Sequence, residues 1–160
     1  MSGAHYDVLF VCTANQCRSP MAEYLYRHQF CAGGRRRCAS AGIIATPGVP
    51  ASRFAVTAMQ ELSIDIRDHR SAPLTASLLN QSRVVAVMTD VHRQLIMGRF
   101  PACEGRIVLL GAFDAHGPCQ PADIADPVGL SLEVYRAVRD RIAAALWGLE
   151  TSLIEKQGTD

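Results

Sequence analysis

A cysteine and an arginine separated by five residues lie in the stretch VCTANQCRSP, residues 11–20. An apolar run precedes Cys12, and a helical pattern begins just after Arg18. A turn from a buried strand into a helix can point its backbone N–H groups at one place, toward the positive end of the helix dipole. A thiol held there ionises more readily than a free cysteine, and a planar guanidinium can donate to two oxygens of one phosphoryl group. The pair therefore predicts an anion-binding loop suited to phosphoryl transfer onto sulfur.

The same spacing occurs a second time, at Cys31 and Arg37. Six cysteines and sixteen basic side chains in 160 residues make a chance match easy, so the surrounding sequence must decide. The second match follows a helical pattern, and Gly33 and Gly34 beside a run of arginines are typical of a helix end and a solvated loop. We therefore interpret the second match as coincidental. For the first match, a packed cysteine beside a surface arginine remains the alternative on this window alone.

Apolar runs and helical patterns alternate along the chain. Strands are expected at residues 6–11, 37–41, 84–88 and 106–110. Helices are expected at residues 19–31, 51–62, 90–100 and 131–149. This order predicts an α/β fold, a parallel sheet with helices on both faces, in which ligands bind beyond the carboxyl ends of the strands. The last helix is expected to bury one stripe, formed by Leu132, Tyr135, Val138, Ile142, Ala145 and Leu149.

Composition narrows the class of protein further. No repeat or linker divides the chain, so we expect one domain over residues 1–160, with residues 151–160 as a tail that frays. A net charge of +1 predicts no attraction to nucleic acid, and no apolar run reaches the roughly 18 residues of a membrane span. The start MSGAHYDVLFVCT lacks the basic segment and cleavage site of a signal peptide. Hydrophobic residues make up 49% of the chain, so its six cysteines are not needed as disulfides, which favours reduced thiols and a cytoplasmic location.

The stretch VLFVCTANQCRSPMAE, residues 8–23, resembles the signature of low molecular weight protein tyrosine phosphatases. The resemblance continues over most of the chain, in SAG (40–42), GVPA (48–51), HRS (69–71), VMT (87–89) and DP (126–127). It implies a four-stranded parallel sheet of order 2-1-3-4, with the phosphate-binding loop after the first strand. It also implies hydrolysis through a phosphocysteine, without metal or other cofactor, of tyrosine-phosphorylated proteins. The similarity to bacterial members suggests a bacterial tyrosine kinase as the opposing enzyme.

The resemblance gives each residue of the site a role. Cys12 is expected to attack phosphorus, while Asp126 protonates the leaving oxygen and later takes a proton from water. Asp126 lies before a proline in the turn-rich segment 111–130, a position that favours it over Asp114 and Asp123; a turn or capping role is its alternative. The phosphate is expected to contact Thr13, Ala14, Asn15, Gln16, Cys17 and Arg18. Four residues are expected to support this loop: Asn15, Ser19, Ser40 and His69.

Three positions differ from many relatives. Val128 follows the Asp-Pro pair where many relatives carry an aromatic residue that lines a slot for the phenyl ring. Gln16 is polar, and related enzymes that remove phosphate from arginine also differ there, by carrying threonine. A phosphoarginine phosphatase is therefore an alternative. Ala14 stands where glycine is frequent, which predicts a negative φ at this position.

Two further functions share the same loop. An arsenate reductase of this fold needs a resolving cysteine pair late in the chain, but Cys103 and Cys119 are sixteen residues apart, and Cys31 and Cys38 come early. A non-catalytic phosphate-binding module would lack the acid. We therefore favour the phosphatase, and the sequence does not indicate its oligomeric state.

The remaining thiol and imidazole groups add one expectation each. Cys17 lies five positions after Cys12, so a curled loop can bring the two thiols to disulfide distance after oxidation by peroxide. The alternative is that Cys17 only fills space beneath the loop. No metal site is expected, because His5, His28, His92 and His116 have no metal-ligand spacing with the cysteines.

Overall fold

The computed structural model describes residues 5–115 and 122–157 of the chain. Four parallel strands form one sheet in the order β2-β1-β3-β4. The strands are β1 (Tyr6–Cys12), β2 (Cys38–Gly42), β3 (Ser82–Val87) and β4 (Ile107–Leu109). The α-helices are α1 (Arg18–Phe30), α2 (Arg53–Gln60), α3 (Ala76–Asn80), α4 (Asp90–Arg99) and α5 (Leu132–Gln157). Three short 3-10 helices are η1 (Ala32–Gly34), η2 (Pro101–Arg106) and η3 (Leu110–Phe113). The predicted α/β class and strand order are confirmed.

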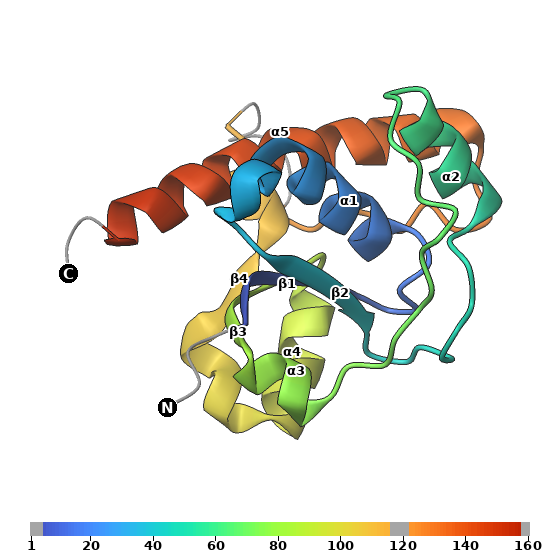
Figure 1. The fold of residues 1–160 in the computed structure, drawn as a ribbon. Helices are drawn as coiled ribbons and strands as arrows, with labels where there is room; N and C mark the ends of the chain where they lie inside the picture. The colour runs from blue at the N-terminus through green and yellow to red at the C-terminus, as the bar shows by residue number, and fades with distance from the viewer. Residues whose placement is uncertain (1–4, 116–121, 158–160) are drawn as a thin grey trace.

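Helices cover both faces of the sheet. Helices α1, α2 and α5 lie on one face, and α3 and α4 lie on the other (Figure 1). Side chains of a strand alternate between the two faces. In β1, Val8, Phe10 and Cys12 therefore enter the cluster beneath α1, α2 and α5, whereas Leu9 and Val11 enter the cluster on the opposite face. This alternation places the thiol of Cys12 on the same side of the sheet as α1.

The last helix is longer than the sequence predicts. Five of the six residues of the predicted apolar stripe are buried in the core, and Leu132 packs against it. Leu153, four positions after Leu149, continues this stripe and is only 3% exposed. The expectation that the tail frays from residue 151 is wrong, since α5 is helical through Gln157; residues 158–160 lie outside the described part.

Between β2 and β3 the sequence predicts one helix, and the structure has two. The additional helix, α3, spans five residues, too few to produce a helical period in the sequence. Its first turn is capped by Thr75, whose side chain accepts a hydrogen bond from the backbone N–H of Leu78. Strand β2 begins one residue later than predicted, at Cys38, and ends at Gly42. None of the helices within the described ranges has the length and apolar character needed to cross a bilayer.

Candidate active site

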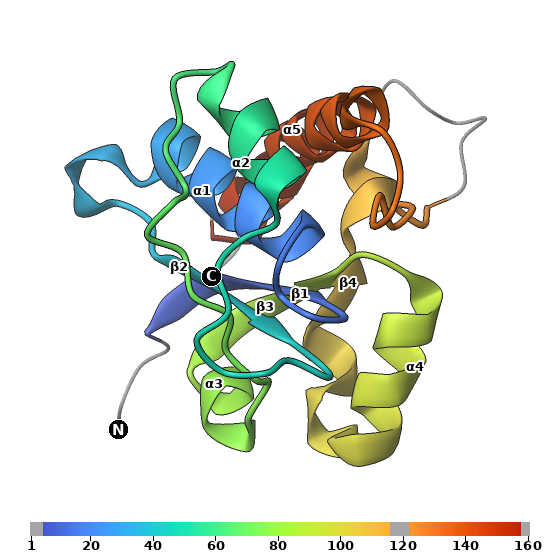
Figure 2. The ribbon, with the colours of Figure 1, turned by 90° about the vertical axis from the view of Figure 1, so that its right-hand side faces the viewer.

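The loop from β1 into α1, residues 13–17, leaves the carboxyl end of a central strand and turns back over the sheet (Figure 2). A cavity of about 270 Å³ opens above this loop. Its lining residues are Cys12, Thr13, Ala14, Gln16, Cys17, Arg18, Asp126 and Val128. The fold thus brings Asp126, more than one hundred positions away in the sequence, to the same cavity as Cys12 and Arg18.

Cys12 ends β1 and is 3% exposed. Its Sγ lies 2.9 Å from the Oγ of Ser19, which is in the first turn of α1. The N-cap position of α1 is occupied by Cys17, which makes no side-chain capping hydrogen bond. Ser19 is therefore not the helix cap, and its hydroxyl faces the Cys12 thiol instead.

The supporting residues predicted from the sequence meet around Asn15. Its φ of 58° puts Asn15 in the left-handed region, while Ala14, for which a negative φ is predicted, is not among the described non-glycine residues with positive φ. The Asn15 amide donates to Ser19 Oγ at 2.8 Å and to Ser40 Oγ at 2.9 Å. Its Oδ1 accepts the backbone N–H of residue 72 at 2.9 Å, and His69 Nε2 lies 2.8 Å from the Asn15 carbonyl oxygen. These bonds hold a strained residue in place, so the loop has one fixed shape.

Glu23 extends this network and was not predicted. It lies on α1, is 8% exposed, and its carboxylate accepts a hydrogen bond from Ser40 and pairs with Arg27. Because the Ser40 hydroxyl donates to Glu23, its oxygen lone pairs remain for the amide of Asn15. The sequence does indicate the pair of Glu23 with Arg27, because the two residues are four positions apart on a predicted helix, a spacing that favours ion pairs.

His92, which no motif of the sequence places in the site, also contacts the loop. Its Nε2 lies 2.9 Å from Thr13 Oγ1, and the side chain is 5% exposed. Burial, aided by the positive charge of Arg18, lowers the pKa of His92 to about 4. His92 is therefore a neutral imidazole at physiological pH and positions Thr13 without adding charge to the site.

Gly42, at the end of β2, permits a close approach of two backbones. A Cβ at this position would lie 2.7 Å from the carbonyl oxygen of Thr13 and 2.9 Å from the carbonyl carbon of Ala14. The next residues also pair with the loop, since the N–H groups of Ile43 and Ile44 donate to the carbonyls of Cys12 and Thr13. The glycine therefore lets β2 support the loop from below.

Arg18 is 3% exposed and lies between the loop and the segment that follows residue 121. Its Nη1 donates to the Ile124 carbonyl at 2.9 Å, and its Nη2 lies 3.2 Å from Asp126 Oδ2. Its Nε is buried and has no hydrogen-bond partner among the described residues. The carboxylate of Asp126 is 45% exposed and accepts the N–H of Val128 at 3.1 Å. Asp126 thus stands at the mouth of the cavity, and Arg18 reaches its floor.

Cys17 lies in a packed environment. It is 4% exposed, donates to Ser52 Oγ at 3.2 Å, and lies 3.4 Å from the hydroxyl of Tyr135. Burial is the main reason that the pKa of Cys17 is raised and that the pKa of Tyr135 rises to about 12. Both Cys17 and Cys12 line the cavity.

Fold and site together define an α/β protein whose first strand-to-helix loop carries a thiol and a guanidinium, with a carboxylate opposite. The family model of low molecular weight phosphotyrosine protein phosphatase matches residues 7–158. The chain therefore belongs to this family and is a phosphoric monoester hydrolase.

Relatives support the same assignment. A protein-arginine-phosphatase of Bacillus subtilis (strain 168) is 35% identical over 150 residues, covering 92% of this chain and 96% of the relative. The probable low molecular weight protein-tyrosine-phosphatase EpsP of Ralstonia nicotianae is 36% identical over 135 residues, covering 84% of this chain and 87% of the relative. The solved structure of the YwlE arginine phosphatase from Geobacillus stearothermophilus has a TM-score of 0.84 at 36% identity and covers 95% of each chain.

Several sequence expectations concern residues beyond this site. Within residues 5–115 and 122–157, no group of three or more His, Cys, Asp or Glu side chains is arranged to hold a metal ion. Cys103 is buried in the cluster on the opposite face of the sheet from Cys12. Cys119 and His116 lie outside the described residues.

Proposed function

We propose that this phosphatase hydrolyses phosphotyrosine in proteins through a phosphocysteine on Cys12. The observation that carries the proposal is the shared cavity of Cys12, Arg18 and Asp126, which supplies a nucleophile, a phosphate-binding fork and an acid. The buried Nε of Arg18, which has no partner among the described residues, supplies a donor for a phosphoryl oxygen.

In the first step the Cys12 thiolate attacks phosphorus, which forms the S–P bond and breaks the P–O bond to the phenol. The N–H groups of the loop and the guanidinium of Arg18 hold the three non-bridging oxygens. Asp126, at the mouth of the cavity, donates its proton to the departing oxygen. Ser19, 2.9 Å from the sulfur, donates to the thiolate and so keeps it aimed at the loop axis.

In the second step water attacks the phosphorus of the phosphocysteine. Asp126, now a carboxylate, takes a proton from this water, and the S–P bond breaks. The hydroxyl of Ser19 stabilises the returning thiolate. The contact between Asp126 and Arg18 gives the acid a fixed place opposite the loop, close to where the leaving oxygen would lie.

Phosphoarginine is the second candidate substrate. Relatives named protein-arginine-phosphatase, from Bacillus subtilis and Geobacillus stearothermophilus, are 35% and 36% identical over 92% and 95% of this chain. The eight lining residues of the cavity include no aromatic side chain, and Val128 at its rim is 62% exposed. A cavity without an aromatic slot gives a phenyl ring no stacking partner. The preference for phosphotyrosine over phosphoarginine is therefore weaker than in a cavity that has such a slot.

A comparison of three phosphopeptides tests the proposal. Peptides with phosphotyrosine, phosphoarginine or phosphoserine are incubated with the purified protein in the presence of a metal chelator. We expect phosphotyrosine to be hydrolysed on the order of 100-fold faster than phosphoserine, because Cys12 is only 3% exposed and the longer tyrosine side chain carries its phosphate further from the peptide backbone. Faster hydrolysis of phosphoarginine than of phosphotyrosine would select the second candidate. Hydrolysis that requires a metal would contradict the mechanism.

Partners and location follow from this function. We propose tyrosine-phosphorylated proteins as partners, with a bacterial tyrosine kinase as the enzyme that opposes this one. A cytoplasmic location agrees with the need for a reduced Cys12 thiol, because a cytosolic thiol pool keeps such a nucleophile from forming disulfides.

A further inference from the structure

Cys31 and Cys38 lie close together, away from the cavity that holds Cys12. Their sulfur atoms are 4.0 Å apart. Cys31 is the C-cap residue of α1 and is half-buried, while Cys38 is the first residue of β2 and is 9% exposed. The fold therefore brings together two thiols, Cys31 and Cys38, for which the sequence analysis predicts no role in the site of Cys12.

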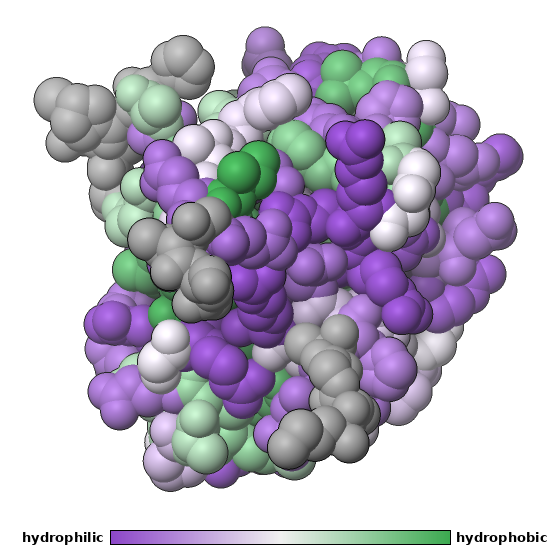
Figure 3. All heavy atoms as spheres, turned by 60° about the vertical axis from the view of Figure 1, so that its left-hand side comes forward, coloured by the Kyte–Doolittle hydropathy of each residue, from purple (hydrophilic) through white to green (hydrophobic). Residues whose placement is uncertain are grey.

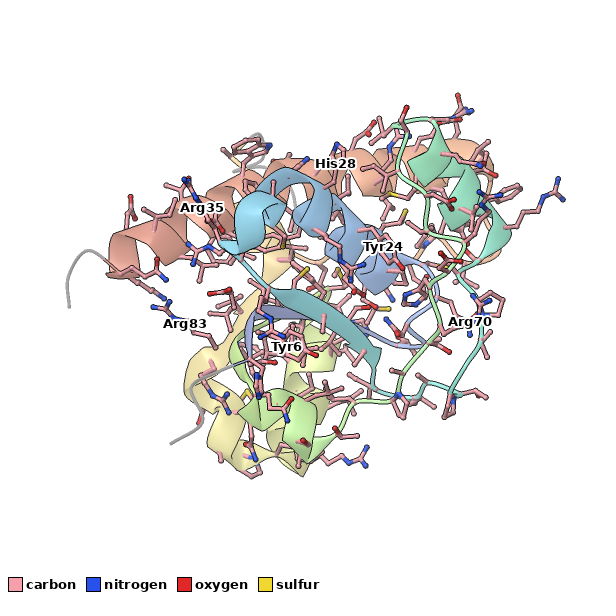
Figure 4. All side chains as sticks on the ribbon, in the orientation of Figure 1. Tyr6, Tyr24, His28, Arg35, Arg70 and Arg83 are labelled. Atoms are coloured by element: carbon pink, nitrogen blue, oxygen red, sulfur yellow. The ribbon has the colours of Figure 1, made fainter. Side chains whose placement is uncertain are left out.

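Both thiols line a second cavity, of about 400 Å³, which opens between the end of α1 and the start of β2. Its lining residues are Tyr6, Glu23, Arg27, Cys31, Arg36, Arg37, Cys38 and Ala39. Three guanidinium groups against one carboxylate make this lining cationic. Figure 4 shows Tyr6 on β1 and Arg35 after α1 on the same side of the molecule, and the space-filling view toward that side is largely hydrophilic (Figure 3).

Arg37 is the arginine best placed to meet a ligand from solution. Arg27 pairs with Glu23, and Arg36 pairs with Glu150 and Asp7. The guanidinium of Arg37 is instead exposed, lies 5.9 Å from the centre of the Tyr6 ring, and has no carboxylate partner among the described residues. An anion that entered this cavity would therefore find a free cation beside the two thiols.

We propose that Cys31 and Cys38 form a second redox site, which a small disulfide bearing carboxylates oxidises to an intramolecular disulfide. The geometry requires the sulfurs to move about 2 Å closer to reach bonding distance. Cys31 stands at the end of α1, just before Gly33 and Gly34, whose φ angles of 73° and 71° mark an unusual turn in this connection. A movement of this helix end, rather than of the paired strand β2, brings the sulfurs together.

The reaction consists of two thiol–disulfide exchanges. The thiolate of Cys31, the more accessible of the two, attacks one sulfur of the small disulfide, forms a mixed disulfide and expels one thiolate. Cys38 then loses its proton, attacks the sulfur of Cys31 and expels the second small thiolate. Two electrons pass from the protein to the small disulfide, which leaves as two thiols once both thiolates are protonated.

The surroundings of the two thiols set the rate and the stability of the product. Burial raises the pKa of Cys31 and of Cys38, so few thiolates are present at neutral pH and exchange is slow. The same property makes each sulfur a poor leaving group, so the disulfide resists reduction once it has formed. Cys38 also donates a hydrogen bond to the backbone carbonyl of Glu23 at 3.5 Å, which holds it near α1.

The test uses the Cys12→Ser, Cys17→Ser double variant, so that active-site thiols do not take part and the outcome is independent of the proposed function. The variant is treated with oxidised glutathione and digested with trypsin. Arginines 35–37 separate the two cysteines, so digestion yields residues 28–35 and 38–53 as separate peptides unless a disulfide joins them. We expect the joined pair, its loss on reduction, and a melting temperature raised by roughly 5 °C in the oxidised protein. Absence of the joined pair from treated protein, or its equal formation in urea, would overturn the proposal.

Two controls separate the parts of the proposal. Adding Cys38→Ser should stop the reaction at a mixed disulfide on Cys31; glutathione on Cys31 that persists when Cys38 is present would overturn the pairing.

Cystamine, a small disulfide with positive charges, should react about tenfold more slowly than oxidised glutathione at low salt, and Arg37→Gln should reduce that difference. Equal rates for the two reagents would overturn the preference for an anionic disulfide.

Discussion

The side chain of Asp126 has three functions. It caps a turn through the N–H of Val128, contacts Arg18, and faces the cavity of Cys12. Facing the cavity, it can transfer a proton to the leaving group. Only this function depends on how basic the leaving group is. The chemistry of the substrate can therefore separate the catalytic role of Asp126 from its structural ones.

We expect Asp126→Ala to slow hydrolysis of phenyl phosphate by roughly 10² to 10⁴, the usual contribution of a general acid. Formation of the phosphocysteine from a strongly activated aryl phosphate should slow much less, because its leaving group needs no proton. Single-turnover rates with both substrates provide the measurement. Equal losses with the two substrates would assign the acid role to another residue.

Cys17 leads to a redox prediction at the active site. It shares a cavity with Cys12, but burial raises its pKa and it is hydrogen-bonded to Ser52, so we expect it to act as a resolving thiol rather than as the first target of peroxide. After peroxide treatment, wild type should recover most of its activity with a dithiol reductant. The activity of Cys17→Ser should not recover, because its Cys12 is oxidised irreversibly to sulfinic acid. Equal recovery in both proteins, with no Cys12–Cys17 linkage in a peptide map, would leave Cys17 a packing residue only.

His92 makes stability depend on pH. Its pKa is about 4 in the folded protein and 6.5 in its ordinary state, so the unfolded chain binds more protons between these values. The contribution of neutral His92 to the free energy of unfolding is fully present above pH 6.5. It is lost as the pH falls toward 4, which lowers the free energy of unfolding by up to about 3 kcal/mol.

Urea unfolding at pH 7 and pH 4.5 measures this effect. Between pH 7 and pH 4.5, the free energy of unfolding of wild type should fall by about 2 kcal/mol more than that of His92→Gln. His28→Gln, at an exposed position, is the matched control and should behave as wild type. An identical pH dependence in wild type and His92→Gln would show that His92 does not titrate in this range.

At the scale of elements, the end of β2 is a support for the loop that follows β1. Adding a methyl group at Gly42 would push against the Thr13 carbonyl at 2.7 Å, where no flexible side chain can move aside. We expect Gly42→Ala to lower kcat/KM by at least about tenfold, because a shift of the loop misplaces the donors that hold the transition state. Gly98→Ala, on α4 where a Cβ would meet open space, is the control and should keep full activity. Normal kcat/KM and phosphate inhibition in Gly42→Ala would contradict this role of β2.

What the sequence predicts well is local. The strand, loop and helix around Cys12 are contiguous, so their residue types and spacing predict both the elements and the place of Arg18. The contacts of His92 with Thr13 and of Gly42 with the loop depend on which strands lie side by side, information that no local pattern contains. The proximity of Cys31 and Cys38 likewise depends on the path of the turn through Gly33 and Gly34, which the local sequence does not indicate.

Errors at element ends have a second cause. Helix α3 is too short to show a period, and the predicted end of the last helix, at residue 149, lies eight residues before the observed end of α5 at Gln157. In the structure Leu153 is buried against the core, which shows that packing, rather than local composition, sets where the helix ends.

At the scale of the whole molecule, strand order places the site. Strand β1 is an inner strand, so its carboxyl end has β2 on one side and β3 on the other. The loop after β1 thus receives Ser40 and Gly42 from β2, while the backbone after β3 holds Ile124 through Met88. One layer of helices buries the base of the loop, and the segment carrying Asp126 closes over its opening. The site is therefore a product of the topology as much as of its residues.

In the proposed mechanism, Cys12 becomes covalently phosphorylated during turnover. The most direct measurement is the mass of the protein quenched in acid within its first turnover of an activated aryl phosphate, followed by peptide mapping. The phosphocysteine mechanism predicts that the protein gains the mass of one phosphoryl group on the peptide that contains Cys12, and that Cys12→Ala shows neither turnover nor this gain in mass. Turnover with no phosphorylated protein at any quench time, or a phosphoryl group on another residue, would contradict it.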